Sequence, residues 1–204
     1  MVVARKWILK KAFEGTPTLD NFELATKEIP AREDGEVLLE TEAISVDPYQ
    51  RPFTRTMVPP FTMIGSQVAR VVESKDPAYP VGAKVVSYLG WVDKIKIKTK
   101  DIPPTTAGLD KIRLAPEVGD LPSSYLLGAL GMPGNTAYFG FLEICKPKEG
   151  ETVLVNGAAG AVGSLVGQIA KIKGCKVIGY AGSEEKVEWL KTLGFDHVFN
   201  YKKV

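Results

Sequence analysis

Cysteine and histidine are scarce in this chain of 204 residues, which has two cysteines and one histidine. Cys145 and Cys175 lie on different predicted elements, so we expect two free, buried thiols rather than a disulfide framework. His197 stands alone, and a Cys/His metal centre needs more ligands than these three residues supply. The sequence therefore predicts no zinc or other metal site.

Long apolar runs and a strong excess of one charge are absent as well. No run of apolar residues reaches the length of a membrane span, and residues 1–11 lack the apolar core of a secretory signal. The formal net charge is +2, which is too small to indicate nucleic-acid binding. We expect a cytoplasmic protein that binds neither a membrane nor a nucleic acid.

A buried strand, a glycine-rich turn and a helix follow one another in the second half of the chain. Residues 152–155 form a short β-branched, apolar run, which is typical of a parallel strand covered on both faces. Residues 161–173 place apolar side chains at three- and four-residue steps, and Gly174 provides a C-terminal stop. This order favours a phosphate-binding turn, whereas glycines without these flanking elements would be equally typical of a structural loop.

The glycines between this strand and this helix are spaced Gly157-x-x-Gly160-x-x-Gly163. Small residues there let main-chain N–H groups at the helix start approach a pyrophosphate. Ala158 takes the place of the first glycine of the usual dinucleotide fingerprint, and the absence of a following Gly-Lys-Ser/Thr excludes a kinase-type phosphate loop. The predicted dinucleotide contacts are Gly160, Ala161, Val162 and Gly163.

The next predicted strand, residues 176–181, ends at Gly182 and Ser183, where an NAD-selective site usually has a carboxylate that binds the ribose. Ser183 is a suitable N-cap for the helix that follows, and Lys186 lies in the first turn of that helix. Because Lys186 would attract an additional ribose phosphate, we expect NADP(H) as the cofactor. Two neighbouring glutamates argue against this, and the alternative is a solvated helix start in which Lys186 pairs locally.

A third strand is predicted at residues 196–201. Its end would place Tyr201 beside the adenine or its phosphate, with ordinary packing as the alternative. A doubly wound dinucleotide domain generally has about six parallel strands, and only three are found before Val204. We therefore expect residues 128–204 to be the first part of a Rossmann domain, in a chain that is truncated at its C-terminus.

Residues 1–127 have a different pattern, in which short strands are separated by proline and glycine. The predicted strands are residues 4–9, 22–28, 36–46, 67–74, 83–89 and 94–100. In the last of these, lysine alternates with isoleucine, which indicates an exposed strand and leaves an anion-binding face as the alternative. The sequence therefore predicts a β-rich first domain.

Two helices are expected near the boundary between the domains, at residues 123–130 and 136–145, with a turn at residues 131–134 between them. The backbone of such a turn could pack against a flat ring such as the nicotinamide of a dinucleotide. Met132 and Thr136 are therefore candidates for nicotinamide contacts. The alternatives are a methionine that fills the core and a threonine that caps a helix.

Four segments together resemble the zinc-independent medium-chain dehydrogenase/reductases. They are VDPYQR at residues 46–51, GMPGNTAYFG at 131–140, NGAAGAVG at 156–163 and GSEEK at 182–186. The resemblance implies an α/β fold in which a GroES-like barrel, residues 1–127, precedes the partial Rossmann domain with its doubly wound parallel sheet. It also implies cofactor contacts at residues 160–163, Lys186 and Tyr201.

The activity that the resemblance implies is the NADPH-dependent reduction of the carbon–carbon double bond in α,β-unsaturated ketones and aldehydes. The substrates of the family include keto-prostaglandins and lipid-derived alkenals, and leukotriene hydroxyl dehydrogenation is a further activity. Tyr49 and Arg51 resemble the family's cleft lining, with a structural role in a proline-marked turn as the alternative. Gln50 stands where a methionine is expected. The family's tyrosine that serves the enolate lies on a loop beyond Val204, so we name no catalytic residue.

Two other functions are compatible with the same residues. A quinone reductase would share the barrel, the cofactor domain and the absence of metal. A non-catalytic NADPH-binding fragment is suggested by the incomplete sheet. For the favoured activity we expect a lipid enone or enal as the small-molecule partner. The resemblance implies a homodimer for the full-length family and leaves the state of this chain open.

Overall fold

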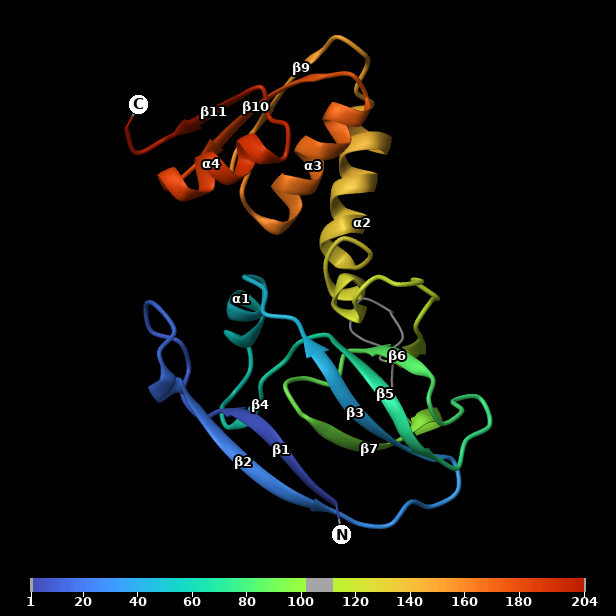
Figure 1. The fold of residues 1–204 in the computed structure, drawn as a ribbon. Helices are drawn as coiled ribbons and strands as arrows, with labels where there is room; N and C mark the ends of the chain where they lie inside the picture. Colours follow the sequence, from blue (N-terminus) through green and yellow to red (C-terminus); the bar gives the residue numbers. More distant parts are fainter. Residues whose placement is uncertain (1, 102–111, 204) are drawn as a thin grey trace. The chain divides into compact units, whose positions relative to one another are not determined.

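The chain divides into two compact units, Met1–Leu127 and Gly128–Val204 (Figure 1). The computed structural model describes residues 2–101 and 112–203. The first unit is built mainly of antiparallel strands, and the second alternates parallel strands with helices.

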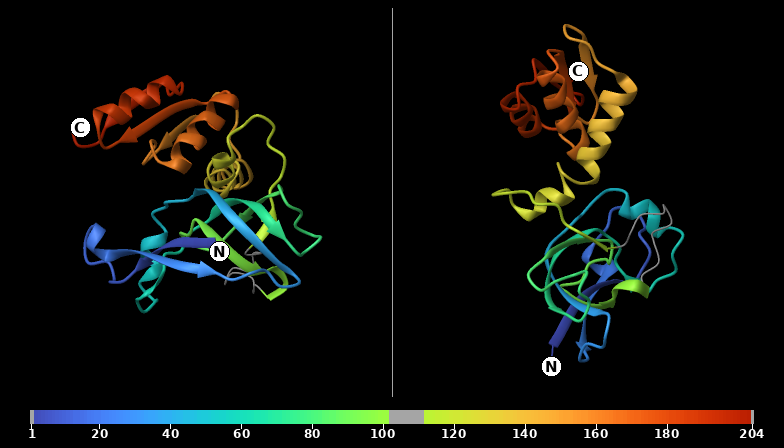
Figure 2. Two further views of the ribbon diagram at one scale, coloured as in Figure 1. Left: turned by 60° about the horizontal axis from the view of Figure 1, so that its bottom comes forward. Right: turned by 90° about the vertical axis from the view of Figure 1, so that its right-hand side faces the viewer.

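Two curved sheets form the first unit and together make an incomplete barrel (Figures 1 and 2). The three-stranded sheet has the order β2-β1-β4 and the five-stranded sheet the order β7-β3-β5-β6-β8. The strands are β1 (Val2–Leu9), β2 (Phe22–Ile29), β3 (Glu36–Ile44), β4 (Phe61–Thr62), β5 (Gln67–Ser74), β6 (Lys84–Ser87), β7 (Lys94–Lys98) and β8 (Ile112–Leu114). Their inward-facing aliphatic side chains form the core of the unit, which includes Val37, Leu39, Val71 and Val85.

The predicted strands of the first unit are present, with shifted ends. The alternating lysines and isoleucines lie on β7, where Ile97 is buried. Lys94 and Lys96 face β3 and form ion pairs with Glu40 and Glu36 at 3.1 and 2.7 Å. β7 is an edge strand of the five-stranded sheet, but four of its five residues are partly or fully buried, so the expectation of an exposed strand is wrong for its side chains. Lys94 and Lys96 are paired within the sheet. The strand ends at Lys98 rather than at residue 100, because the chain turns there into the 3₁₀ helix η2 (Thr99–Asp101).

The second unit contains a parallel sheet of the Rossmann type, in the order β11-β10-β9 (Figure 1). The strands are β9 (Thr152–Val155), β10 (Lys176–Ala181) and β11 (His197–Asn200), and the helices between them are α3 (Ala161–Ile172) and α4 (Glu184–Thr192). Buried side chains of both helices and of the inward face of the sheet form a single core, which includes Val155, Ala170, Val177, Leu190 and Phe195. These elements match the predicted ranges because each has a local periodic pattern and a local stop.

The remaining helices are short. They are η1 (Leu19–Asn21), α1 (Gln50–Thr54), η3 (Ser123–Leu127), α2 (Met132–Tyr138) and the π-helical segment η4 (Phe139–Cys145). The predicted turn at residues 131–134 is wrong, because α2 begins at Met132. Proline is tolerated in the first turn of a helix. Position 134 excludes a side chain, because a Cβ there would lie 1.7 Å from the carbonyl oxygen of Ala129. The predicted helix at residues 123–130 is also wrong beyond Leu127, where the chain turns.

Candidate functional site

The carboxyl ends of β9, β10 and β11 lie at one edge of the parallel sheet. In parallel sheets this edge is where ligands bind, since the loops that follow neighbouring strands meet there. The structure therefore places the glycine-rich turn, the Gly182 turn and Tyr201 along the same edge. All of them belong to the second unit.

The glycine-rich turn has a shape that its own hydrogen bonds fix. Gly157 has a positive φ of 61°, and the N–H of Gly160 donates to the carbonyl oxygen of Gly157 at 2.9 Å. Ala158 is fully buried, and its N–H donates to the carbonyl oxygen of Tyr180 on β10 at 3.0 Å. The turn is thus anchored to the sheet before the helix begins.

Gly163 lets the first turn of α3 lie directly against this loop. A Cβ at residue 163 would be 2.6 Å from the carbonyl oxygen of Gly157 and 2.9 Å from the Cα of Ala158, which is closer than atoms can approach. One turn further along α3, a Cβ at Gly167 would meet the ring of Phe195 at 1.9 Å. The small residues of this segment therefore permit close packing of helix, loop and sheet.

The start of α3 carries main-chain donors that the protein leaves available. No side chain caps the helix at Gly160, and the first helical hydrogen bond runs from the N–H of Ser164 to the carbonyl oxygen of Gly160 at 3.0 Å. Among the described residues, the N–H groups of Ala161, Val162 and Gly163 donate to no acceptor outside the helix, and the first turn of a helix has none inside it. Such a set of donors, together with the helix dipole, suits a phosphate group.

The start of α4 differs, because the Ser183 side chain caps it by accepting a hydrogen bond from the N–H of Lys186 at 3.4 Å. The Lys186 side chain is exposed and forms no ion pair within the described ranges. The Glu184 carboxylate contacts residues that follow β11 rather than Lys186. Its Oε1 accepts from Nδ2 of Asn200 at 2.7 Å and lies 3.1 Å from Nζ of Lys203. Local pairing of Lys186 is therefore not observed.

Tyr201 lies against the backbone at the end of β10. A Cβ at Gly182 would be 2.8 Å from the Tyr201 hydroxyl and 3.2 Å from two ring atoms. The N–H of Tyr201 donates to the carbonyl oxygen of Ala181 at 3.1 Å, and 56% of the side chain remains exposed. The structure thus brings Tyr201 next to the Gly182 turn, one residue before the Ser183 cap.

Met132 and Thr136 lie one turn apart on α2. The Thr136 hydroxyl donates to the carbonyl oxygen of Met132 at 2.7 Å and lies 3.7 Å from its sulfur. Both side chains are exposed. Met132 is therefore not a core filler, and Thr136 bonds back along its own helix rather than capping the helix start.

Tyr49 and Arg51 belong to the first unit, at the start of α1. Burial is the main cause that raises the pKa of the Tyr49 phenol, and hydrogen bonding to Tyr88 raises it further. The ring of Phe53 packs edge-on against Tyr49, with 5.6 Å between the ring centroids. Arg51 is half-buried. Tyr88 is a neighbour of Tyr49 that the sequence did not indicate.

Gln50 lies between these two residues and is only 3% exposed. Its Nε2 donates to the carbonyl oxygens of Ser45 and Ile64, both at 3.0 Å, and its Oε1 accepts from the N–H of Asp47 at 3.0 Å. All three bonds are to the main chain. Gln50 therefore fixes the backbone of the loop that carries Tyr49.

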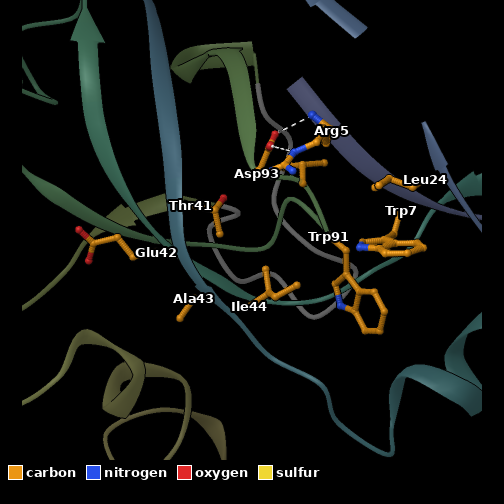
Figure 3. A pocket seen from close by; sticks show the side chains of 10 residues that line it. Arg5, Trp7, Leu24, Thr41, Glu42, Ala43, Ile44, Trp91 and Asp93 are labelled. Carbon is orange, nitrogen blue, oxygen red and sulfur yellow. Dashed lines mark hydrogen bonds and ion pairs between the residues drawn. The ribbon is translucent and has the colours of Figure 1, made fainter. Parts of the chain in front are cut away.

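A shallow pocket of about 390 Å³ opens on the first unit (Figure 3). Its lining combines two tryptophans with apolar and charged side chains, namely Arg5, Trp7, Leu24, Thr41, Glu42, Ala43, Ile44, Trp91, Val92 and Asp93. Arg5 and Asp93, which are neighbours in this lining, form an ion pair at 2.7 Å. None of the predicted site residues lines this pocket.

Within residues 2–101 and 112–203, no group of three or more His, Cys, Asp or Glu side chains is arranged to hold a metal ion. Within the same residues, no helix combines the length and the apolar character that a membrane crossing requires.

Comparisons with known proteins match both units of the chain. A family model described as "N-terminal domain of oxidoreductase" matches residues 5–104, and one described as "Zinc-binding dehydrogenase" matches residues 161–204. Prostaglandin reductase 1 of Rattus norvegicus is 57% identical over 204 residues, which cover 100% of this chain and 60% of the relative. The 2-alkenal reductase (NADP(+)-dependent) of Nicotiana tabacum is 41% identical over 96% of this chain and 58% of the relative.

A solved structure agrees with these relatives. The crystal structure of CurA in complex with NADPH from Vibrio vulnificus is 40% identical, with a TM-score of 0.80 over 97% of this chain and 58% of that one. The chain thus spans 58–60% of the length of these proteins. Because two family models and a relative 57% identical along the whole sequence agree, the chain belongs to the zinc-independent medium-chain dehydrogenase/reductase family.

Proposed function

We propose that this chain is part of an NADPH-dependent reductase of the carbon–carbon double bond in α,β-unsaturated ketones and aldehydes. The observation that carries the proposal is the uncapped start of α3 above a tightly packed glycine turn, at the carboxyl edge of a parallel sheet. Main-chain donors in this position bind a pyrophosphate without any side chain.

The residues of the second unit fit each part of the cofactor. Gly160, Ala161, Val162 and Gly163 would hold the pyrophosphate. Lys186 and Tyr201 would meet the additional ribose phosphate and the adenine, and the turn at Gly182 and Ser183 has no carboxylate of its own to repel that phosphate. Met132 and Thr136 would contact the nicotinamide. When bound, NADPH would supply the hydride that the reduction requires.

The substrate class is supported by the names of the relatives, a prostaglandin reductase and a 2-alkenal reductase. In the proposed reaction a hydride and a proton add across the double bond, so the substrate gains two electrons. Tyr49 and Arg51 would line the substrate cleft. Burial and the hydrogen bond with Tyr88 raise the pKa of the Tyr49 phenol, so this group would stay protonated beside the substrate. The proposal also includes a lipid enone or enal as the partner, a homodimer and a cytoplasmic location.

Titration of the purified chain with NADPH and NADH, followed by fluorescence, tests the cofactor part of the proposal. We expect NADPH to bind at least tenfold more tightly than NADH, because Lys186 attracts the additional phosphate. Lys186→Ala should weaken NADPH binding and leave NADH binding unchanged. Lys191→Ala, on the same helix but paired with Glu188 at 2.7 Å, is the matched control. Equal affinity of the unmodified chain for the two nucleotides would contradict the role of Lys186.

Addition of an enone to the NADPH-bound chain then separates the three candidate functions. Oxidation of NADPH by an enone, and not by a quinone, supports the proposal. Oxidation by a quinone alone would favour a quinone reductase. Selective binding of NADPH without turnover of either substrate would favour a non-catalytic NADPH-binding fragment.

A further inference from the structure

The carboxylate of Glu184 is held by two residues that follow β11. Glu184 is the first residue of α4, next to the Ser183 cap. Its Oε1 accepts a hydrogen bond from Nδ2 of Asn200 at 2.7 Å and an ion-pair contact from Nζ of Lys203 at 3.1 Å. Two residues distant in sequence thus converge on one oxygen of a carboxylate beside the cofactor edge.

The amide of Asn200 has a fixed orientation. Its Oδ1 accepts from the N–H of Lys202 at 3.1 Å, so Nδ2 is the atom that is left to face Glu184. The N–H of Lys203 also donates to the main-chain oxygen of Asn200 at 2.9 Å. The short loop at residues 200–203 is therefore folded in a way that presents both donors to the carboxylate.

The charge of Glu184 affects the proposed phosphate site because α4 begins directly after the Gly182 turn. The hydrogen bond from Asn200, and then the one from Lys203, lower the pKa of this carboxyl, so it is ionised at neutral pH. An ionised carboxylate next to the Gly182 turn would repel a ribose phosphate. Lys186, two positions further on, forms no ion pair in the described part of the chain. Residues two apart on a helix do not face each other, so Glu184 would act on the phosphate rather than on Lys186.

We propose that Asn200 and Lys203 are positioning residues for the choice of cofactor. They hold the Glu184 carboxylate against the loop after β11, so that Lys186 is the charge that the additional phosphate of NADPH meets. This inference rests on the proposed function, because it assigns a role at the same nucleotide edge. It explains how Glu184, the first residue of this helix, is compatible with a phosphate-bearing dinucleotide.

A double-mutant cycle tests the inference by direct binding of NADPH and NADH to the full chain. Asn200→Ala removes one donor without a change of charge. We expect it to weaken NADPH binding about threefold to tenfold, because the freed carboxylate then reaches the phosphate, and to leave NADH binding unchanged. In a Glu184→Gln background, Asn200→Ala should have no effect on either nucleotide, because no carboxylate remains to be released.

Lys203→Ala should act in the same direction, and Lys191→Ala serves again as the matched loss of a paired lysine on α4. A loss of affinity for NADPH and NADH alike in Asn200→Ala would indicate a general structural role and would overturn the inference. Persistence of the effect in the Glu184→Gln background would overturn it too, as would unchanged selectivity in Asn200→Ala. If the unmodified chain binds no nucleotide, the proposed function itself fails, and the inference fails with it.

Discussion

At the scale of single residues, the phenol of Tyr49 lies in surroundings that disfavour its ionised form. Desolvation is the largest cause, and the hydrogen bond with Tyr88 adds to it. The ionised form of Tyr49 is therefore less favourable in the folded protein than in the unfolded chain. A group of this kind links the stability of the fold to pH.

The sign of this linkage gives a prediction for the first unit. Because the pKa of Tyr49 is higher in the folded state, its contribution to stability is complete below the unfolded value of about 10 and is lost as the pH rises above it. We expect the free energy of unfolding to fall more steeply above pH 10 in the unmodified protein than in Tyr49→Phe. Urea titrations of the two proteins between pH 8 and pH 11 measure the difference, and parallel curves would contradict the prediction.

At the scale of elements, the junction of β9, the glycine turn and α3 depends on contacts that no larger residue permits. The requirement at Gly163 is spatial, since the loop atoms of Gly157 and Ala158 occupy the place of a Cβ. The same junction presents the donors of Ala161 and Val162. Packing and the proposed cofactor binding therefore depend on the same few atoms.

Gly163→Ala tests this dependence. The added methyl group has to displace the loop, so we expect the free energy of unfolding to fall by about 1–3 kcal/mol and NADPH affinity to fall at least tenfold. Gly140→Ala is the matched control, because nothing lies within 4 Å of a Cβ at that helical position. Calorimetry and NADPH titration measure the two effects. An alanine variant at residue 163 that binds NADPH as tightly as the unmodified chain would show that the loop is not the cradle.

The elements also show why sequence patterns predict some features and miss others. The strands and helices of the second unit were predicted because strand periodicity, an N-cap and glycine stops are local properties. The residues at 131–134 have the composition of a turn, yet they begin a helix. Gly134 is needed there because a side chain would collide with the backbone of Ala129. The hydrogen bond between Asn200 and Glu184 depends on how β11 and α4 meet, which no local pattern encodes. The roles of residues 160–163, Lys186 and Tyr201 stay predictions until ligand binding is measured.

At the scale of the whole molecule, the second unit buries one face of its sheet more deeply than the other. Parallel sheets are usually covered on both faces, whereas α3 and α4 form one core with a single face of the second unit's sheet. On the opposite face, Leu154 on β9 and Phe199 on β11 are 57% and 40% exposed. Stability in this unit therefore depends strongly on the one core that its helices share.

Ligand binding should stabilise the second unit in particular. The predicted pyrophosphate, ribose and adenine contacts all lie in residues 128–204, and a ligand present at a hundredfold excess over its Kd adds about 2.7 kcal/mol to the stability of the state that binds it. We expect NADPH to slow hydrogen exchange in β9, β10 and α3 more than in β1 and β2. NADH at the same concentration should have a smaller effect. Equal protection of both units, or of neither, would contradict the prediction.

Gln50 also constrains which residues position 50 can accept. Its amide satisfies the carbonyl oxygens of Ser45 and Ile64 and the N–H of Asp47, and a thioether in its place could not donate to either oxygen. An exchange of glutamine for methionine here would strand buried polar groups unless neighbouring residues changed with it. The loop that carries Tyr49 therefore depends on the amide of Gln50, and a single exchange to methionine would remove all three main-chain contacts at once.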